Sequence, residues 1–443
     1  MVSRQAARLL ADTPAIAEAH FLAEAEPYDP DVRPGGYLNL GTAENRLLWD
    51  LLDGRLAALE PMTESTARYA PLHGTGVLRE RIAALLSATC RTPLDAEDLV
   101  VISGATGALD AIASVLCDPG EAIVVPAPYY GAFDTDLGGR SGARILPAPL
   151  EPGDGFRLTA DAVDRALKQA AAEGTTVRAV ALSSPSNPLG EVHHPQVLAE
   201  LLRVVAEHDV DLVSDEIYAH AVFGPHAFTS AADPAVNPHW ADRTHVVWGF
   251  AKDFGLPGLK TGVLHTRDPR VRDAARAMAY FAPVSTATQH TLAGLLADPA
   301  WVASFLAAGR RRLGSSYAHL VAHLDAYRIP YVPAEAGFSV WLDLRRWLPG
   351  TGFDAEQRLW RELFETARVS ILPGGAFRSP EPGWFRLCHT VEAPLVAEAV
   401  RRIAGHLGGT PVDALLPRSP SSLPSPSSPS SPSSLSDPNG RRP

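Results

Sequence analysis

The sequence predicts an α/β protein: a three-layer sandwich with a mostly parallel sheet, joined to a smaller α/β domain. Between about residues 65 and 283, short apolar runs alternate with helical stretches, and this alternation is typical of a parallel sheet with helices on both faces. Strand-like runs return only after a long helix-rich stretch beyond residue 284. A chain of 443 residues is also too long for one hydrophobic core.

The large domain should contain five buried strands, because each is a short apolar run of the length that strands favour. These runs are 99–102, 122–125, 179–182, 211–213 and 245–248. Residues 79–87, 108–116 and 195–208 carry the helical pattern between them. In the smaller domain, residues 338–344 and 384–388 are the expected strands.

These elements define the expected domain limits. We expect an N-terminal arm and part of the small domain at 1–64, the large domain at 65–283, and the rest of the small domain at 284–408. Residues 409–443 are rich in serine and proline and have almost nothing apolar to bury, so they should form a disordered tail.

Bulk composition excludes several classes of protein. A net charge of −11 with no basic tract argues against nucleic-acid binding. No apolar run reaches membrane-spanning length, and acidic residues stand where a signal peptide would be apolar. Three cysteines are too few for a disulfide framework and share no metal-ligand spacing. We therefore expect a cytoplasmic protein without a metal site.

Lysine is scarce, which narrows the search for a reactive amine. The chain has only Lys168, Lys252 and Lys260. Lys252 follows the apolar run 244–248, where burial would lower the pKa of its ammonium and make the free amine a nucleophile and base. Lys168 lies in an amphipathic helical pattern and is expected on the surface.

Polar motifs follow several of the predicted strands, where an open α/β sheet binds its ligands. The small residues of 103–108 precede a helix, so backbone N–H groups there suit a phosphate, although a plain strand–helix turn explains them equally well. Prolines flank Asn187 and would hold its amide rigidly, but a simple turn is the stronger local explanation.

Other single residues also have two interpretations. Asp215 and Tyr218 share a face of a helical turn, and Asp215 suits either a helix N-cap or the counter-ion of a protonated ring nitrogen. Tyr130 offers an aromatic plate or ordinary core packing. Arg386 lies on an apolar strand and needs an anionic partner, either a structural carboxylate or a substrate carboxylate.

Taken together and in order, these segments resemble the fold-type I pyridoxal-phosphate (PLP) enzymes of the class I/II aminotransferase family. Within that family they look most like 1-aminocyclopropane-1-carboxylate (ACC) synthases. The resemblance runs from about Tyr37 to Leu407. Its most specific segments include Gly41-Thr-Ala-Glu-Asn, Pro185-Ser-Asn-Pro-Leu-Gly, Lys252-Asp-Phe-Gly-Leu-Pro-Gly and Glu381-Pro-Gly-Trp-Phe-Arg.

The resemblance implies roles around PLP. Lys252 would hold the cofactor as a Schiff base and then remove the substrate α-proton. Asp215 would pair with the pyridinium nitrogen and keep the ring an electron sink. Asn187 and Tyr218 would bind the 3′-oxygen, with Asn187 also facing the substrate, and Tyr130 would stack on the ring.

It implies further roles at the edges of the site. Ala105 and Thr106 would bind the phosphate, and Arg386 would bind the substrate α-carboxylate in a fork. Tyr69 resembles a tyrosine that reaches the phosphate of the neighbouring subunit, which implies a homodimer with shared sites. Glu44 would lie near a sulfonium or amine.

Four positions depart from the family pattern. Gly249 and Ala251 stand where many members have serine, and Lys260 stands where an arginine usually binds the phosphate. Lysine is a point charge and not a planar fork, so phosphate binding should be looser or the pocket remodelled. Arg46 stands where ACC synthases usually have glutamine.

The leading hypothesis is therefore a PLP enzyme acting on S-adenosylmethionine, with loss of methylthioadenosine from Cγ. The product is either a closed cyclopropane or, after γ-elimination, an adduct captured by a second substrate in carbon–carbon bond formation. The main alternative is an aminotransferase that passes an amino group to a 2-oxo acid. A non-catalytic regulator with this fold is disfavoured, because Lys252, Asp215, Asn187 and Tyr218 are all present.

Overall fold

In a computed structural model of the chain, residues 2–3, 6–7 and 15–412 are described. The centre is a seven-stranded sheet in the order β2 (Leu99–Ser103), β8 (Thr261–His265), β7 (Thr244–Gly249), β6 (Asp211–Asp215), β5 (Val177–Ser183), β3 (Ala122–Ala127) and β4 (Arg144–Pro149). Only β8 runs antiparallel to its neighbours. The predicted mostly parallel α/β sheet is confirmed, and most of the predicted tail (413–443) lies outside the described residues.

All five predicted strands are present, and two further strands were not predicted. β4 contains Pro147 and Pro149 and forms an edge of the sheet, where proline is tolerated but weakens the strand signal. β8 is short and contains Gly262, which carries no side chain to contribute to an apolar pattern. A Cβ on Gly262 would lie 2.3 Å from the carbonyl carbon of Gly104, so glycine lets the helix that begins at Gly104 approach the sheet.

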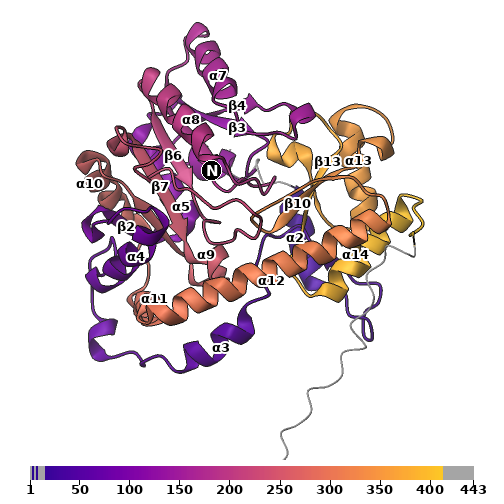
Figure 1. Cartoon of the computed structure of the whole chain (residues 1–443), viewed down its shortest axis with the longest axis horizontal. Coiled ribbons are helices and arrows are strands. Elements are labelled where there is room, and N and C mark those ends of the chain that lie inside the picture. The colour runs from indigo at the N-terminus through magenta and orange to yellow at the C-terminus, as the bar shows by residue number, and fades with distance from the viewer. Residues whose placement is uncertain (1, 4–5, 8–14, 413–443) are drawn as a thin grey trace, which may run out of the picture.

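Helices cover both faces of this sheet (Figure 1). One core packs α5 (Gly104–Leu116) and α10 (Pro269–Met278) against residues such as Val125. The other packs α7 (Ala160–Ala172) and α8 (Pro195–Glu207) against residues such as Val124. Adjacent residues of one strand therefore point into different cores, as a strand buried on both faces requires.

A second sheet forms the smaller part of the molecule. Its order is β12 (Leu372–Pro373), β13 (Trp384–Cys388), β10 (Ser339–Asp343) and β9 (Tyr331–Val332), all antiparallel. The helices α12 (Pro299–Ala326), α13 (Gly352–Glu365) and α14 (Ala393–His406) contribute residues to its core. In Figure 1, α12 runs across the front of the molecule from one part to the other.

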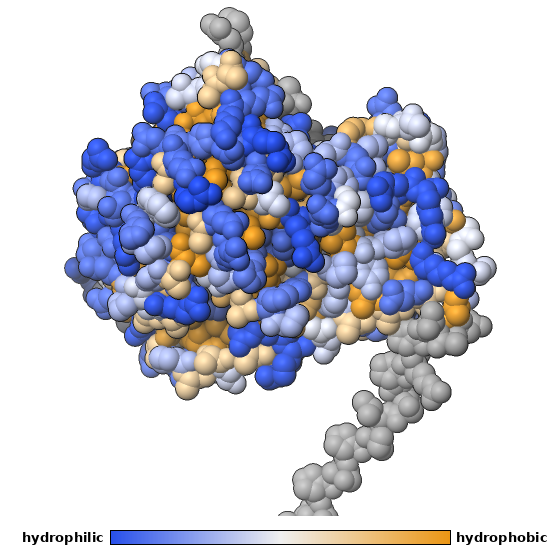
Figure 2. All heavy atoms as spheres, turned by 45° about the horizontal axis from the view of Figure 1, so that its top comes forward, coloured by the Kyte–Doolittle hydropathy of each residue, from blue (hydrophilic) through white to orange (hydrophobic). Residues whose placement is uncertain are grey.

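The N-terminal segment joins this second core. β1 (Leu38–Asn39) pairs in parallel with β11 (Val369–Ser370), and α2 (Ala15–Ala25) places Ala19 and Ala23 in the same core. Figure 2 shows a notch between a larger and a smaller lobe.

Among the described helices, no single one is long and apolar enough to cross a bilayer. α11 (Thr286–Leu296) and α12 reach that length and composition only as a pair, which is bent by 88°.

Candidate active site

A cavity of about 360 Å³ lies where β5, β6 and β7 end. Most of the site residues predicted from the sequence line its walls. Among the lining residues are Ala105, Thr106, Tyr130, Asn187, Asp215, Tyr218, Lys252, Lys260 and Arg386. Parallel strands present their carboxyl ends at one edge of a sheet, which is why residues so far apart in sequence meet here.

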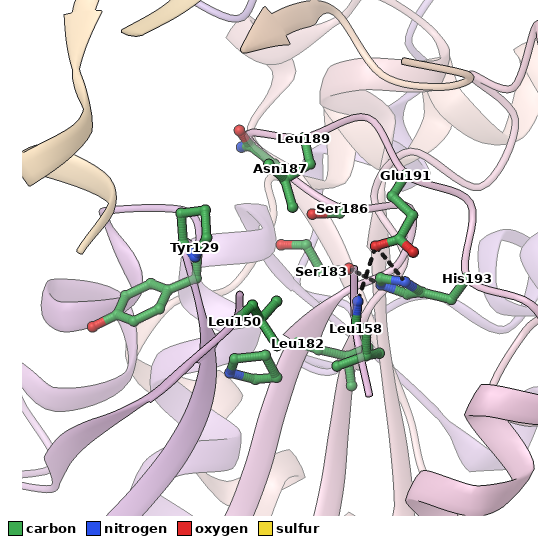
Figure 3. A pocket seen from close by; sticks show the side chains of 12 residues that line it. Tyr129, Leu150, Leu158, Leu182, Ser183, Ser186, Asn187, Leu189, Glu191 and His193 are labelled. Atoms are coloured by element: carbon green, nitrogen blue, oxygen red, sulfur yellow. Dashed lines mark hydrogen bonds and ion pairs between the residues drawn. The ribbon is translucent and has the colours of Figure 1, made fainter. Parts of the chain in front are cut away.

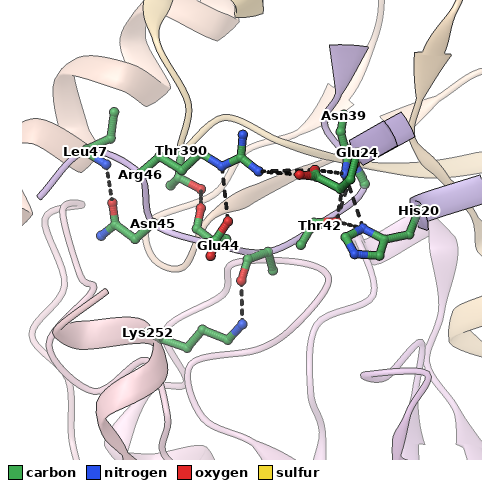
Figure 4. Close-up of polar contacts among 12 residues, drawn as sticks. His20, Glu24, Asn39, Thr42, Glu44, Asn45, Arg46, Leu47, Lys252 and Thr390 are labelled. Atoms are coloured by element: carbon green, nitrogen blue, oxygen red, sulfur yellow. Dashed lines mark hydrogen bonds and ion pairs between the residues drawn. The ribbon is translucent and has the colours of Figure 1, made fainter. Parts of the chain in front are cut away.

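Lys252 lies on α9 (Phe250–Asp253), one helical turn directly after β7. Burial, followed by the charge of Arg386, lowers the pKa of Lys252 to about 8. Its Nζ donates a hydrogen bond to the carbonyl oxygen of Ala43 (Figure 4). About a tenth of this lysine would therefore be the free amine at pH 7 and about half at pH 8, far more than for an ordinary lysine.

The next residue, Asp253, fixes that helical turn. Its Oδ2 accepts hydrogen bonds from Trp248 Nε1 at 2.9 Å and from the backbone N–H of His220 at 3.2 Å. Burial raises the pKa of Asp253 to about 8. The carboxyl group ties α9 to both β7 and the segment after Tyr218, so it positions Lys252.

Asp215 ends β6 and is buried at the base of the cavity. Burial raises the pKa of its carboxyl to about 7, opposed by the backbone N–H of Ile217, which donates to Oδ1 at 3.3 Å. The carboxyl of the neighbouring Glu216 instead accepts bonds from Ser214 and Ala231. A cationic N–H in the cavity would satisfy Asp215 and return it to the ionised form.

Arg386 reaches the cavity from β13 and is buried. Its Nη1 donates to Asn187 Oδ1 at 3.1 Å and its Nη2 to the carbonyl oxygen of Gly41 at 2.6 Å. The guanidinium lies over the ring of Phe377 at 4.8 Å. Its Nε has no partner, and within the described part of the chain no carboxylate forms an ion pair with it. This unsatisfied cation favours an anionic ligand over a structural carboxylate.

Two tyrosines form the aromatic part of the wall. The rings of Tyr218 and Phe338 pack edge-on with their centroids 5.0 Å apart, and those of Tyr130 and Phe133 pack edge-on with centroids 5.5 Å apart. Burial raises the pKa of both hydroxyls above the ordinary range, so both stay protonated and are available as hydrogen-bond donors.

The start of α5 lines one end of the cavity. Gly104 has a φ of 77°, a conformation that glycine adopts without strain, and it begins the helix whose first residues line the cavity. The N–H groups in the first turn of a helix have no partner within the helix, so this end suits an anion. The Thr106 hydroxyl donates to Asp136 Oδ2 at 3.1 Å. Lys260 also lines the cavity but is exposed.

Asp136 was not predicted as a site residue from the sequence, although it lies in the cavity wall and is buried. It belongs to α6 (Phe133–Gly138). The missed signal is its spacing, because an aspartate three residues after Phe133 and next to Leu137 lies on the buried face of that helix.

Two predicted site residues do not line the cavity, although the charge of Glu44 still acts on Lys252. The carboxylate of Glu44 binds Arg46 Nε at 3.1 Å, and Arg46 Nη2 continues to Glu24 on α2 at 3.2 Å, so Glu44 is not in the cavity wall (Figure 4). The side chain of Tyr69 is fully exposed, at 104% relative accessibility.

A polar network behind Asn187 holds the loop that carries it (Figure 3). His193 Nε2 donates to the carbonyl oxygen of Ser183 at 3.1 Å, and its Nδ1 lies 3.4 Å from the Glu191 carboxylate. The backbone N–H of Ser186 donates to the Glu191 carbonyl at 2.9 Å. These contacts fix the loop between β5 and α8 beside the cavity.

The chain is similar to known proteins both in sequence and in structure. The sequence model of the family "Aminotransferase class I and II" matches residues 36–403. ACC synthase 4 of Oryza sativa subsp. japonica is 36% identical over 400 residues, covering 82% of this chain and 81% of that protein. ACC synthase 6 of Arabidopsis thaliana is 34% identical over 379 residues, covering 82% and 77%. Aspartate aminotransferase from Thermus thermophilus with maleate superposes with a TM-score of 0.77 at 23% identity, covering 92% of this chain and 99% of that one, and so shares the fold.

Proposed function

Because the chain belongs to the aminotransferase class I and II family, we propose that its cavity binds S-adenosylmethionine and promotes loss of methylthioadenosine from Cγ. The chain is a PLP-dependent enzyme, like the ACC synthases that it resembles. The observation that carries the substrate assignment is this 34–36% identity to ACC synthases over most of the chain.

The cavity residues fit PLP. When bound, PLP supplies an electron sink for negative charge at the substrate Cα. Asp215 is a buried carboxyl suited to a protonated ring nitrogen, and Asn187 and Tyr218 offer polar groups for the 3′-oxygen. Tyr130 offers a ring face, and the start of α5 with Thr106 suits the phosphate.

Two side chains then act on the substrate. Arg386 holds the α-carboxylate through its unpartnered Nε and a neighbouring Nη, which fixes the Cα–H bond toward Lys252. Lys252, with its lowered pKa, takes the Cα proton on Nζ. The Cγ–S bond then breaks, and its electron pair leaves with sulfur as the neutral thioether methylthioadenosine.

The four-carbon unit has two possible fates in this cavity. In ring closure, the Cα electron pair forms a Cα–Cγ bond as the Cγ–S bond breaks, giving ACC. In γ-elimination, a proton also leaves Cβ, its electron pair forms a Cβ–Cγ double bond as the Cγ–S bond breaks, and a second substrate adds to that double bond. The departures at Gly249, Ala251, Lys260 and Arg46 support keeping this second fate as a candidate.

We also propose a cytoplasmic homodimer with shared sites. Tyr69 is exposed, as expected for a side chain that resembles a tyrosine reaching the partner's phosphate, and other large apolar side chains are exposed as well. Among them are Trp49, Met62, Val77, Tyr280 and Phe281. Large apolar side chains left in water are expected to become buried in a partner interface.

Incubation of the purified holoenzyme with S-adenosylmethionine, followed by mass analysis, tests the proposal. We expect methylthioadenosine together with either free ACC or, in the presence of a nucleophilic second substrate, a four-carbon adduct. Free ACC alone would eliminate the coupling variant. Transfer of the amino group to a 2-oxo acid without methylthioadenosine would establish the aminotransferase alternative and overturn the proposal.

A further inference from the structure

The cofactor cavity contains a second buried carboxyl, Asp136, which has no task in the reaction proposed above. Its side chain lines the cavity, is 7% exposed, and is bonded to the hydroxyl of Thr106. We propose that Asp136 belongs to the phosphate site: it takes up a proton when a phosphate monoester binds, and through Thr106 it supplies a hydrogen bond to that phosphate.

The argument begins with the single proton of the Thr106 hydroxyl. In the structure this proton is donated to Asp136 Oδ2 at 3.1 Å. An ionised carboxylate can only accept hydrogen bonds, and the oxygens of a phosphate dianion can also only accept. Thr106 therefore cannot donate to a phosphate and to an ionised Asp136 at the same time, and turning to the phosphate would leave the buried carboxylate without this partner. Protonation of Asp136 reverses the chain, so that Asp136 donates to Thr106 and Thr106 donates to the phosphate.

The surroundings of Asp136 favour the protonated form. Burial raises the pKa of its carboxyl to about 6, opposed by the Thr106 hydrogen bond and assisted by the negative charge of Asp110. The two carboxyls of the cavity also repel each other, since Asp136 contributes to the raised pKa of Asp215. A phosphate dianion close to Thr106 would raise the pKa of Asp136 further.

The charged groups on neighbouring elements do not compensate Asp136. On α5, the Asp110 carboxylate is itself paired with Arg140 at 3.1 Å. On β4, which packs against α6, Arg144 is exposed and bonded to Thr175. In the residues that the structure describes, no lysine or arginine forms an ion pair with Asp136.

This inference rests on the proposed place of the phosphate at the start of α5, and not on the chemistry of S-adenosylmethionine. It is therefore tested by binding alone. The probes are pyridoxamine 5′-phosphate and pyridoxamine, which differ only in the phosphate and do not form a Schiff base with Lys252. Both are titrated into the full chain freed of cofactor, between pH 6 and pH 9.

We expect the pH dependence of affinity to separate the wild type from Asp136→Asn. A group whose pKa rises on binding favours binding at low pH, so wild-type affinity for pyridoxamine 5′-phosphate should fall as pH rises above about 6. The amide of Asp136→Asn is a neutral donor at every pH, so the ratio of wild-type to variant Kd should grow at least roughly tenfold between pH 6 and pH 9. For pyridoxamine the ratio should stay constant.

Two controls make the test independent of folding. Asp134→Asn, on the same helix, should behave as the wild type, because Asp134 contacts Tyr129 and Arg378 instead of Thr106. In the wild type alone, calorimetry at pH 8 in buffers of different ionisation enthalpy should show about one more proton taken up with the phosphate than without it. Equal proton uptake for the two probes, or an Asp136→Asn ratio that does not change with pH, would overturn the inference. Failure of S-adenosylmethionine turnover would leave it standing.

Discussion

Replacement of Arg386 by lysine tests how the substrate is held. Lysine keeps the positive charge but loses the planar fork. The arginine now bonds Asn187 and the Gly41 carbonyl and still has a free Nε. A lysine ammonium at this position would give the α-carboxylate one directed hydrogen bond in place of two.

The expected loss follows from that one bond. A hydrogen bond to a charged group contributes about 1.5–3 kcal/mol. Because about 1.4 kcal/mol corresponds to a factor of ten, Arg386→Lys should lower kcat/KM for S-adenosylmethionine by about 10- to 150-fold. The carboxylate is held both before and during the reaction, so most of the loss should be in KM.

The assay is the initial rate of methylthioadenosine release over a range of S-adenosylmethionine concentrations, with cofactor loading checked by absorbance. Arg378→Lys is the matched control, because that arginine is more than half exposed and pairs with Asp134 on the surface. The control should change kcat/KM by less than about twofold. A decrease below threefold for Arg386→Lys, with full cofactor loading, would refute the proposed carboxylate clamp.

Three further predictions concern the same cavity. The rate at which the cofactor-free chain links PLP to Lys252 should rise with pH to about 8 and then level off, because burial lowers the pKa of that amine to about 8; a rise continuing to pH 10, followed by absorbance, would contradict this. Asp253→Asn should become more stable relative to the wild type as pH rises from 5 to 8. Burial raises the pKa of Asp253 to about 8 in the folded protein, so the wild type loses stability through this range by up to about 1.4 kcal/mol per pH unit. The neutral asparagine does not titrate and loses none. Chemical denaturation at each pH measures the difference, and a constant difference would exclude the effect. Arg46→Gln should free the Glu44 carboxylate and lower KM for the sulfonium substrate by about fivefold, as expected for removing one like charge near the surface; an increased KM would contradict it.

The sequence predicted the part of the site that depends on strand ends. Lys252, Asp215 and Asn187 each follow an apolar run, and a parallel sheet must bring such positions to one edge. Arg386 was recognised because a cation on an apolar strand needs an anion. In these cases the residues around each position in the sequence were enough to predict that it belongs to the site.

Other features depend on contacts that no local pattern contains. The position of Glu44 is set by Arg46 and by Glu24 on α2, which packs nearby only because the N-terminal segment joins the second core. β8 became part of the sheet through pairing with two distant strands, with Gly262 giving room for α5. Asp136 did leave a local signal on α6, but its contact with Thr106 depends on how α5 and α6 pack.

The central claim is that this cavity breaks the Cγ–S bond of S-adenosylmethionine after Lys252 removes the α-proton. The most direct measurement follows α-deuterated and unlabelled S-adenosylmethionine with the wild type and with Lys252→Ala, quantifying methylthioadenosine and any 2-oxo acid in the same samples. We predict methylthioadenosine from the wild type, formed more slowly from the deuterated substrate, and none above background from Lys252→Ala. Accumulation of the 2-oxo acid without methylthioadenosine, or unchanged release by Lys252→Ala, would contradict the account.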